Sequence, residues 1–291
     1  MKDRALSTIT LWVAVGAFIW IGSLFSASEI FAFCILAALT AVAQWEFYKL
    51  SESCNEQPNK TQGILIGLIY LFFVFFFSPE NYRHSIVPIA LASVVGIHLL
   101  SLLRNPSERP LLLRKLPTFY GFIYIPLMLS FLAFISKLNF GIGLSQKPIG
   151  LACVIWVVVA TKFTDVGGLV IGTLYGRHKI APSISPAKSW EGCIGGLIFS
   201  AAAAALFAWT VNAFGFPFMT PLRSAILALP IAIVSIPSDL VESVFKRQST
   251  SKDSGHTIPG IGGALDLIDS LVLTAPLGFV ILSYAYSWAC G

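Results

Sequence analysis

Long apolar runs without a single charged residue dominate this chain. Four of them contain 24, 19, 20 and 21 residues, and they begin after Arg4, Lys60, Arg83 and Lys115. An α-helix needs about 20 predominantly apolar residues to cross the hydrocarbon core of a bilayer. The pattern therefore predicts an all-α, polytopic integral membrane protein.

We expect about nine transmembrane helices. They cover residues 5–25, 30–48, 62–79, 85–103, 116–136, 148–168, 193–216, 222–237 and 270–289. The second, sixth and eighth have only 16, 14 and 15 uncharged residues before Glu46, Lys162 and Asp239. These three helices reach span length only if a charged residue lies at the membrane interface or inside the helix bundle.

The composition agrees with this pattern. The 291 residues are 56% hydrophobic and 11% charged, with a mean hydropathy of +0.80, whereas soluble domains have roughly 25% charged residues. These values exclude a soluble enzyme. The net charge of +5 is explained by the orientation of loops, so we expect no nucleic-acid partner. The five cysteines have no CxxC spacing, which argues against a disulfide framework or a zinc site.

Lys and Arg residues are distributed unevenly along the chain. If the N-terminus lies in the cytoplasm, alternate segments place 15 of the 19 positive residues inside and only Arg83, Lys137, Lys147 and Arg223 outside. Cytoplasmic loops of membrane proteins carry an excess of positive charge. The first apolar run is longer than the apolar h-region of a typical signal peptide, which has about 7–15 residues, so we expect the run to remain as a span. The charges therefore predict a cytoplasmic N-terminus and an external C-terminus.

Two segments, residues 161–192 and 238–269, are expected to be long cytoplasmic loops. Together they contain fourteen charged side chains, seven of each sign. Orientation in the membrane requires only the positive ones, so the carboxylates require another explanation. We therefore divide the chain into N-terminal membrane helices, 1–145, and a C-terminal part, 146–291, which combines membrane helices with the catalytic loops.

The second loop has the composition of a site for metal and phosphate. Asp266 and Asp269 are three residues apart and would share one face of a helix, and their hard carboxylate oxygens suit Mg²⁺. Nearby glycines would let backbone N–H groups approach an anion, which Lys246, Arg247 and Lys252 would neutralise. The alternative is that Lys246 and Arg247 are ordinary positive residues of a cytoplasmic loop, that Asp239 and Glu242 form a solvated helix face, and that the glycines form a flexible turn.

The first loop contains the segment Ser185-Pro-Ala-Lys-Ser-Trp-Glu-Gly192. Lys188 and Glu191 are three residues apart in it, so a structural ion pair is one interpretation of both. Lys162 and Asp165 have the same spacing and would neutralise one another near the membrane surface.

The two segments resemble the signature of the phosphatidate cytidylyltransferases, also called CDP-diacylglycerol synthases. The similarity lies in Ser243-Val-Phe-Lys-Arg247, Lys252-Asp-Ser-Gly255, Pro259-Gly, Gly262-Gly, Asp266 and Asp269. The segment 185–192 is similar to the family's Ser-Pro-Lys-Lys-Thr-x-Glu-Gly, and Asp165 falls where the family has an Asp before small residues. The motifs cover about residues 160–275, and the N-terminal half agrees only in being polytopic.

Three positions depart from the family pattern. Family members usually have His at the position of Ile261, Arg at that of Leu267 and Lys at that of Ala187. Two cations and one imidazole that could touch phosphate are therefore missing. Every signature carboxylate is present, so the departures concern the phosphate contacts more than the metal.

The resemblance implies a Mg²⁺-dependent nucleotidyltransferase that converts CTP and phosphatidate into CDP-diacylglycerol and pyrophosphate. On this basis we assign Lys188, Asp239 and Asp266 to catalysis. Asp239 and Asp266 would bind the metal, and Asp253 and Asp269 would lie beside it or bind a second cation. The phosphates would be bound by Lys188, Lys246, Arg247 and Lys252. The nucleotide would lie near Ser185 and Glu191. We expect the inner membrane of a bacterium, with the site facing the cytoplasm, and a homodimer is left open.

Two other functions remain open. Another CTP-dependent lipid enzyme, such as a prenol-lipid kinase or an archaeol-type cytidylyltransferase, would use the same cytoplasmic metal site. A secondary transporter would also have intramembrane charges and broken helices. The clustering of charges in two segments on one side and the lack of an inverted repeat between the halves argue against a transporter.

Overall fold

The computed structural model describes residues 28–56, 58–77, 117–138, 149–215, 218–249, 254–255, 257 and 262–287. These residues are almost entirely helical, in agreement with the predicted all-α class. The helices expected at 5–25 and 85–103 lie outside the described residues. The others are present, although several extend further than the sequence predicted.

The described residues belong to two compact units. Unit 1 comprises those of Met1–Phe77, Ser107–Leu129 and Phe245–Asp269, and unit 2 those of Ser78–Pro106, Ser130–Val244 and Ser270–Gly291. The chain passes from one unit to the other within helix α7 (Met128–Ser136), within α10 (Pro221–Gln248) and between Asp269 and Ser270.

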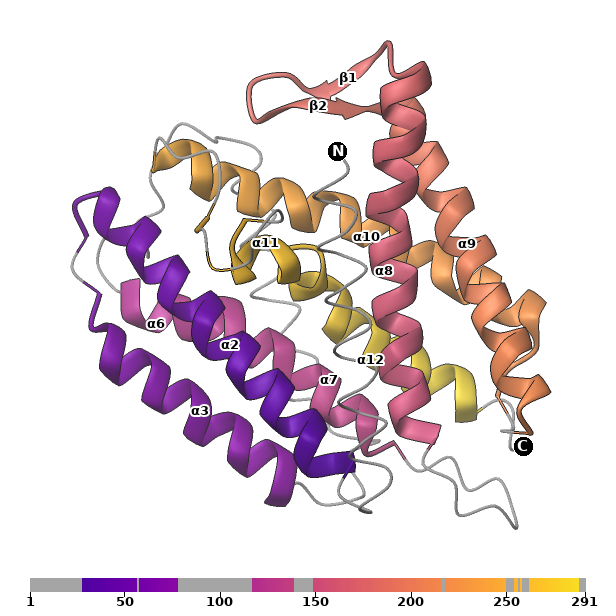
Figure 1. Cartoon of the computed structure of the whole chain (residues 1–291), viewed down its shortest axis with the longest axis horizontal. Helices are drawn as coiled ribbons and strands as arrows, with labels where there is room; N and C mark the ends of the chain where they lie inside the picture. Colours follow the sequence, from indigo (N-terminus) through magenta and orange to yellow (C-terminus); the bar gives the residue numbers. More distant parts are fainter. Residues whose placement is uncertain are drawn as a thin grey trace. The chain divides into compact units, whose positions relative to one another are not determined.

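In unit 1, α2 (Ser28–Ser53) and α3 (Lys60–Phe77) lie side by side, as Figure 1 shows. The unit also contains α6 (Pro117–Phe122), the π-helical turn η2 (Ile123–Leu127) and the short α11 (Ala264–Ile268).

Two kinds of side-chain contact hold unit 1 together. Gln44 on α2 donates hydrogen bonds to the Tyr48 hydroxyl and to the Gly63 carbonyl on α3, at 2.9 and 3.0 Å. The rings of Phe47 and Phe245 pack at 5.5 Å, and both also contact Tyr124 of η2. This buried aromatic cluster fixes the last turn of α10 against α2 and η2.

In unit 2, α8 (Ile149–Tyr175) and α9 (Trp190–Ala213) lie side by side and pack closely along their length (Figure 1). A Cβ atom at Gly167 would lie 2.7 Å from the Gly195 carbonyl oxygen, and one at Gly196 would lie 2.8 Å from the Thr164 carbonyl oxygen. Only glycine permits such close backbone contact. Unit 2 also contains most of α7 and of α10, and α12 (Leu271–Ser287), which packs against α8.

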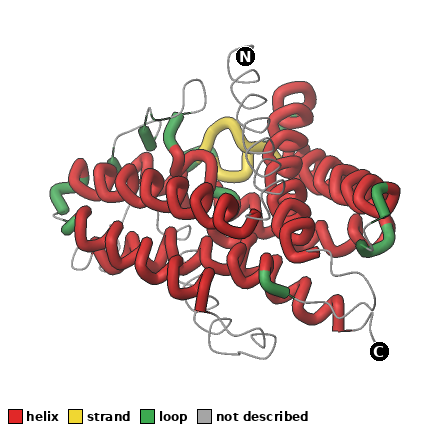
Figure 2. Tube along the Cα trace, turned by 60° about the horizontal axis from the view of Figure 1, so that its bottom comes forward, coloured by secondary structure: helices red, strands yellow, loops and turns green. Residues whose placement is uncertain are grey.

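A small antiparallel hairpin connects α8 to α9, and the sequence did not predict it. Strand β1 (Lys179–Ala181) pairs with β2 (Ser185–Ser189), drawn in yellow in Figure 2. Ser189 caps α9 by accepting a hydrogen bond from the Gly192 N–H at 3.2 Å. Ile184 between the strands is buried against Leu240 and Val244 of α10. The hairpin is therefore anchored to α9 through Ser189 and to α10 through Ile184.

Six of the described helices are long and apolar enough to cross a membrane. They are Ile30–Ser53, Pro117–Ser136, Ile149–Tyr175, Trp190–Ala213, Pro221–Gln248 and Ala264–Tyr284. Large apolar side chains such as Leu174 and Trp209 are more than 60% exposed, as expected where lipid covers the protein. The chain is an integral membrane protein.

Two helices continue into the segments that we expected to be loops. Helix α8 runs to Tyr175, so Lys162 and Asp165 are helical, and α10 runs to Gln248, so Asp239 and the charges after it are helical too. These helices tolerate charge because it is paired: Lys162 Nζ lies 3.2 Å from Asp165 Oδ2. A charged residue therefore does not mark the end of a helix here.

Candidate functional site

An ion pair joins the hairpin to α10. Lys188 on β2 places its Nζ 2.8 Å from Asp239 Oδ2 and also donates to the Ile236 carbonyl at 2.9 Å. The two side chains are only 20% and 28% exposed. The buried contact of Ile184 with α10 holds β2 at the distance that a lysine side chain can bridge. The alternative pairing of Lys188 with Glu191 is not the one that the structure has.

Glu191 pairs instead with the turn that follows α8. Its carboxylate accepts hydrogen bonds from the backbone N–H groups of Arg177 and His178, at 3.2 Å, and lies 2.6 Å from His178 Nδ1. Glu191 lies in the first turn of α9, where a carboxylate is favoured by the helix dipole. Ser185 is half-buried at the start of β2. Both lie on the segment that also contributes Lys188.

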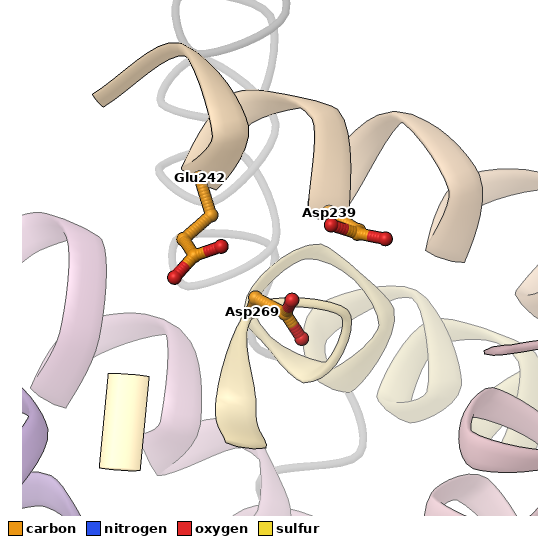
Figure 3. Close-up of side chains that lie close together, drawn as sticks. All are labelled: Asp239, Glu242 and Asp269. Carbon is orange, nitrogen blue, oxygen red and sulfur yellow. The ribbon is translucent and has the colours of Figure 1, made fainter. Parts of the chain in front are cut away.

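A group of three carboxylates could hold a metal ion. Asp239 and Glu242 lie one turn apart on α10, and Asp269 follows α11, as drawn in Figure 3. One oxygen from each residue can be chosen so that all three lie within 4.8 Å of one another. Glu242 is fully buried. Hard oxygen donors at this spacing suit Mg²⁺, and negative charges so close together favour a cation between them.

From the sequence alone, Glu242 was interpreted only as part of a solvated helix face. The spacing of three residues between Asp239 and Glu242 was the available signal, because such a pair shares one side of a helix. What the sequence did not reveal was that α10 continues through both residues. Glu242 therefore joins the expected residues Asp239 and Asp269.

A second ion pair lies in unit 1. Lys246 Nζ, in the last turn of α10, is 2.9 Å from Asp266 Oδ1. The other carboxylate oxygen of Asp266 accepts hydrogen bonds from the Gly263 N–H at 2.6 Å, the Ser254 N–H at 3.2 Å and the Ser254 hydroxyl at 2.8 Å. Asp266 thus caps the N-terminus of its own helix α11. Its side chain also links α11 to Ser254 by hydrogen bonds and to α10 by the ion pair with Lys246.

The backbone N–H groups around α11 are engaged by side chains. Those of Gly263 and Ser254 donate to Asp266, that of Ala264 donates to Thr257 Oγ1 at 3.2 Å, and that of Leu265 donates to Glu46 at 2.8 Å. We expected glycine-rich N–H groups here to face an anion. In the described part of this segment, carboxylate and hydroxyl oxygens of the protein receive them.

A third polar cluster lies within unit 2. Lys162 Nζ donates to Ser270 Oγ at 2.7 Å and contacts Asp165, as the sequence predicted. Asp165 accepts from Ser270 at 2.9 Å and from Ser235 at 3.5 Å. The cluster connects α8, α10 and the start of α12 through a neutralised pair.

The remaining expected site residues are placed as follows. Arg247 is exposed in the last turn of α10, and Lys252 and Asp253 lie outside the described residues. Among the departures, Ala187 is exposed on β2 and Leu267 is half-buried on α11, while Ile261 lies outside the described residues.

Comparison with known proteins identifies the family of this chain. A model of the cytidylyltransferase family matches residues 2–285. The chain is 29% identical over 295 residues to the phosphatidate cytidylyltransferase of Haemophilus influenzae, which covers 98% of each chain. It is 32% identical over 223 residues to that of Rickettsia felis, covering 75% of this chain and 88% of the relative.

A shorter match has higher identity. The phosphatidate cytidylyltransferase of Pseudomonas aeruginosa is 41% identical over 145 residues, which is 50% of this chain and 52% of the relative. With the family match extending over nearly the whole chain, the protein belongs to the cytidylyltransferase family, as a nucleotidyltransferase enzyme of the phosphatidate cytidylyltransferase kind.

Proposed function

We propose that this enzyme transfers the cytidylyl group of CTP to phosphatidate, with Lys188 and Asp239 at the centre of its site. Family membership supports the reaction. The observation that carries the site is the 2.8 Å contact between Lys188 and Asp239. It joins the two segments whose sequences resemble the family signature, although they lie far apart along the chain.

The chemistry explains why charge compensation dominates the site. An oxygen of the phosphatidate phosphate attacks the α-phosphorus of CTP, the bond from that phosphorus to the bridging β-phosphate oxygen breaks, and pyrophosphate leaves. A phosphate monoester is already a nucleophile near neutral pH, so no strong general base is required. Two polyanions must meet, so positive charge and positioning should supply most of the rate enhancement.

We assign the first Mg²⁺ to Asp239, Glu242 and Asp269. Their oxygens can lie within 4.8 Å of one another, and Mg²⁺ prefers carboxylates while leaving its other positions to water and phosphate. When bound, the ion would polarise the phosphoryl group and neutralise developing charge. Asp239 would then divide its two oxygens between the ion and Lys188. Asp253 is assigned to a second cation.

Asp266 has two roles in this proposal. Its hydrogen bonds to Ser254 and Gly263 order the start of α11, and its remaining oxygen, now 2.9 Å from Lys246 Nζ, would face either a second cation or a phosphate-bound Lys246. The ammonium and a divalent cation compete for that oxygen. Substrate binding would resolve the competition by attracting Lys246 to phosphate.

The basic residues bind the phosphates in this proposal. Lys188 would neutralise charge that develops on the reacting phosphates, and Lys246, Arg247 and Lys252 would bind the pyrophosphate portion of CTP or the lipid phosphate. Glu191 and Ser185 lie near the nucleotide. Because Glu191 is tied to His178, its part is to hold the hairpin that presents Lys188.

We place the site at the cytoplasmic face of the bacterial inner membrane. The support is the excess of Lys and Arg in the segments that would be cytoplasmic. CTP would arrive from the cytoplasm, and phosphatidate would enter sideways between helices with its acyl chains still in the hydrocarbon.

The experiment that tests the proposal follows two labels of CTP. Purified enzyme in mixed micelles receives phosphatidate, Mg²⁺ and CTP labelled either in the cytidine or at the γ-phosphate, and chloroform-soluble label is counted. Cytidine label in the lipid and γ-label in pyrophosphate are the expected results. Transfer of only the γ-label would indicate a lipid kinase, and no label in lipid would favour a transporter.

A pair of variants links the reaction to the site. Lys188→Met should lose incorporation, whereas Lys179→Met, at an exposed residue on strand β1 of the same hairpin, should keep it. Equal incorporation by the two variants would refute the assignment of Lys188 while leaving the reaction in place.

A further inference from the structure

Glu46 is a buried carboxylate that none of the recognised motifs contains. It lies on α2, in an apolar helix long enough to span the membrane, and its side chain is 0% exposed. An ionisable side chain at such a position is expensive and is retained where it serves a function. From the sequence alone, Glu46 was expected only to lie at the membrane interface or inside the helix bundle.

All of the partners that Glu46 has among the described residues belong to one segment, residues 254–265. Its Oε2 accepts the Leu265 N–H at 2.8 Å and the Ser254 hydroxyl at 3.4 Å, and its Oε1 accepts the Thr257 hydroxyl. One carboxylate therefore binds the beginning, the middle and the end of the glycine-rich segment. Hydrogen bonds to an ionised acceptor are the strong kind.

At two positions of the segment, the nearby Glu46 carboxylate leaves room only for glycine. A Cβ atom at Gly255 would overlap Glu46 Oε1, and a Cβ atom at Gly263 would overlap Glu46 Oε2 and the Ser254 hydroxyl. The backbone at Gly255 and at Gly263 therefore lies directly against the Glu46 carboxylate. Any larger residue at either position would displace the carboxylate or the loop.

Glu46 and Asp266 both bind residues of the same segment. Ser254 donates its hydroxyl to both carboxylates, at 3.4 Å to Glu46 and 2.8 Å to Asp266. The N–H groups of Gly263 and Leu265 are divided between them, one each. Displacing Glu46 would therefore disturb the hydrogen bonds that orient Asp266 toward Lys246.

We infer that Glu46 is a positioning residue of the reaction: it holds the glycine-rich segment so that Asp266 and Lys246 are presented to the substrates. The inference rests on the proposed function for the roles of Asp266 and Lys246. The role of Glu46 in ordering residues 254–265 rests on geometry alone. These two parts can fail separately.

The test compares Glu46→Gln with a matched control on the same helix. Glu52→Gln removes a carboxylate that is 46% exposed and paired with Lys60. Glutamine keeps the volume of Glu46 but has only one acceptor oxygen, so it cannot receive the donors of Leu265, Ser254 and Thr257 together. We expect kcat to fall about tenfold or more in Glu46→Gln, with KM for CTP changing much less, and no change in Glu52→Gln.

Hydrogen exchange gives the readout that is independent of activity. Peptides that cover residues 262–268 should exchange about tenfold faster or more in Glu46→Gln, while peptides of α8 and α9 keep the parent rates. Unchanged exchange in 262–268 would overturn the inference. Faster exchange with parent kcat would show that Glu46 orders the segment but that the segment does not serve the reaction, which would count against the proposed roles of Asp266 and Lys246.

A second pair of variants covers the case in which Glu46→Gln does not fold. Gly255→Ala adds a methyl group against the carboxylate without removing any charge, and Glu46→Asp shortens the side chain by one methylene. Gly255→Ala should reduce kcat in the parent and reduce it less in the Glu46→Asp background, because the shorter side chain leaves room. Equal reductions in both backgrounds would contradict direct contact between residues 46 and 255.

Discussion

Lys188 on the hairpin and Asp239 on α10 form a half-buried ion pair, with 2.8 Å between the ammonium nitrogen and a carboxylate oxygen. Each residue came from a different segment that resembles the family signature. The pair shows that these segments are in contact, which their separate positions along the chain did not establish. It also means that the Asp239 carboxylate is already paired with the Lys188 ammonium before any metal cation binds.

Removing the charge of Lys188 should abolish most of the activity. In Lys188→Met the apolar stem of the side chain keeps its packing, but the ammonium that would neutralise phosphate is lost, and Asp239 is left without its partner. We expect kcat/KM for CTP to fall about 100-fold or more. Incorporation of labelled CTP into lipid measures this. A loss of less than about threefold, well below the effect of removing one oxyanion-stabilising donor, would be incompatible with the assigned role.

Glu242 should determine the Mg²⁺ requirement. Glu242→Gln removes one anionic donor from the group with Asp239 and Asp269 without changing volume. The Mg²⁺ concentration for half-maximal activity should rise about tenfold or more, whereas Glu52→Gln should leave it unchanged. Mg²⁺ titration of initial rates at saturating CTP gives the values. The same half-maximal concentration in both variants would remove Glu242 from the metal site.

Asp266→Asn separates the two roles of Asp266. Asparagine retains one oxygen that can accept the hydrogen bonds of Gly263 and Ser254, so α11 should form as before, but the charge opposite Lys246 is lost. We expect turnover to fall about 100-fold or more even at saturating Mg²⁺, with unchanged thermal stability in detergent. Parent activity at saturating Mg²⁺ would show that this carboxylate only caps α11.

Membrane sidedness can be tested at two exposed positions. Ser183, in the turn between β1 and β2, is expected in the cytoplasm, and Thr220, just before α10, is expected outside. In inside-out vesicles a membrane-impermeant thiol reagent should label Ser183→Cys, and in intact cells it should label Thr220→Cys. The parent, with its native cysteines, provides the background. Labelling of Ser183→Cys from outside intact cells would reverse the predicted orientation.

The sequence predicted the membrane helices well because their signal is local. About twenty apolar residues in a row can form a span, so α9 and α12 begin and end close to their expected places. Helix ends were harder, since a charge such as Asp165 can lie within a helix when another side chain, here Lys162, pairs with it. The hairpin was missed because β1 and β2 have three and five residues, which is too short for a recognisable alternation.

The candidate site was predicted by residue type but not by partner. Lys188, Asp239 and Asp266 could be named from the resemblance to the family signature. That Lys188 pairs with Asp239 while Glu191 pairs with His178 depends on how the hairpin packs on α10, which is a tertiary relationship. Glu46 carried a signal in the sequence, a carboxylate inside an apolar run, yet its partners lie more than 200 positions away.

The backbone contact between α8 and α9 limits how phosphatidate can reach the site. At Gly167 and Gly196 the two helices leave no space for even a methyl group. Parting them would break carbonyl contacts and helix packing along the pair, so acyl chains cannot pass between these helices on the way in or out. The same close packing makes α8 and α9 a stiff support for the hairpin, so Lys188 would stay in place while the lipid arrives through another gap between helices.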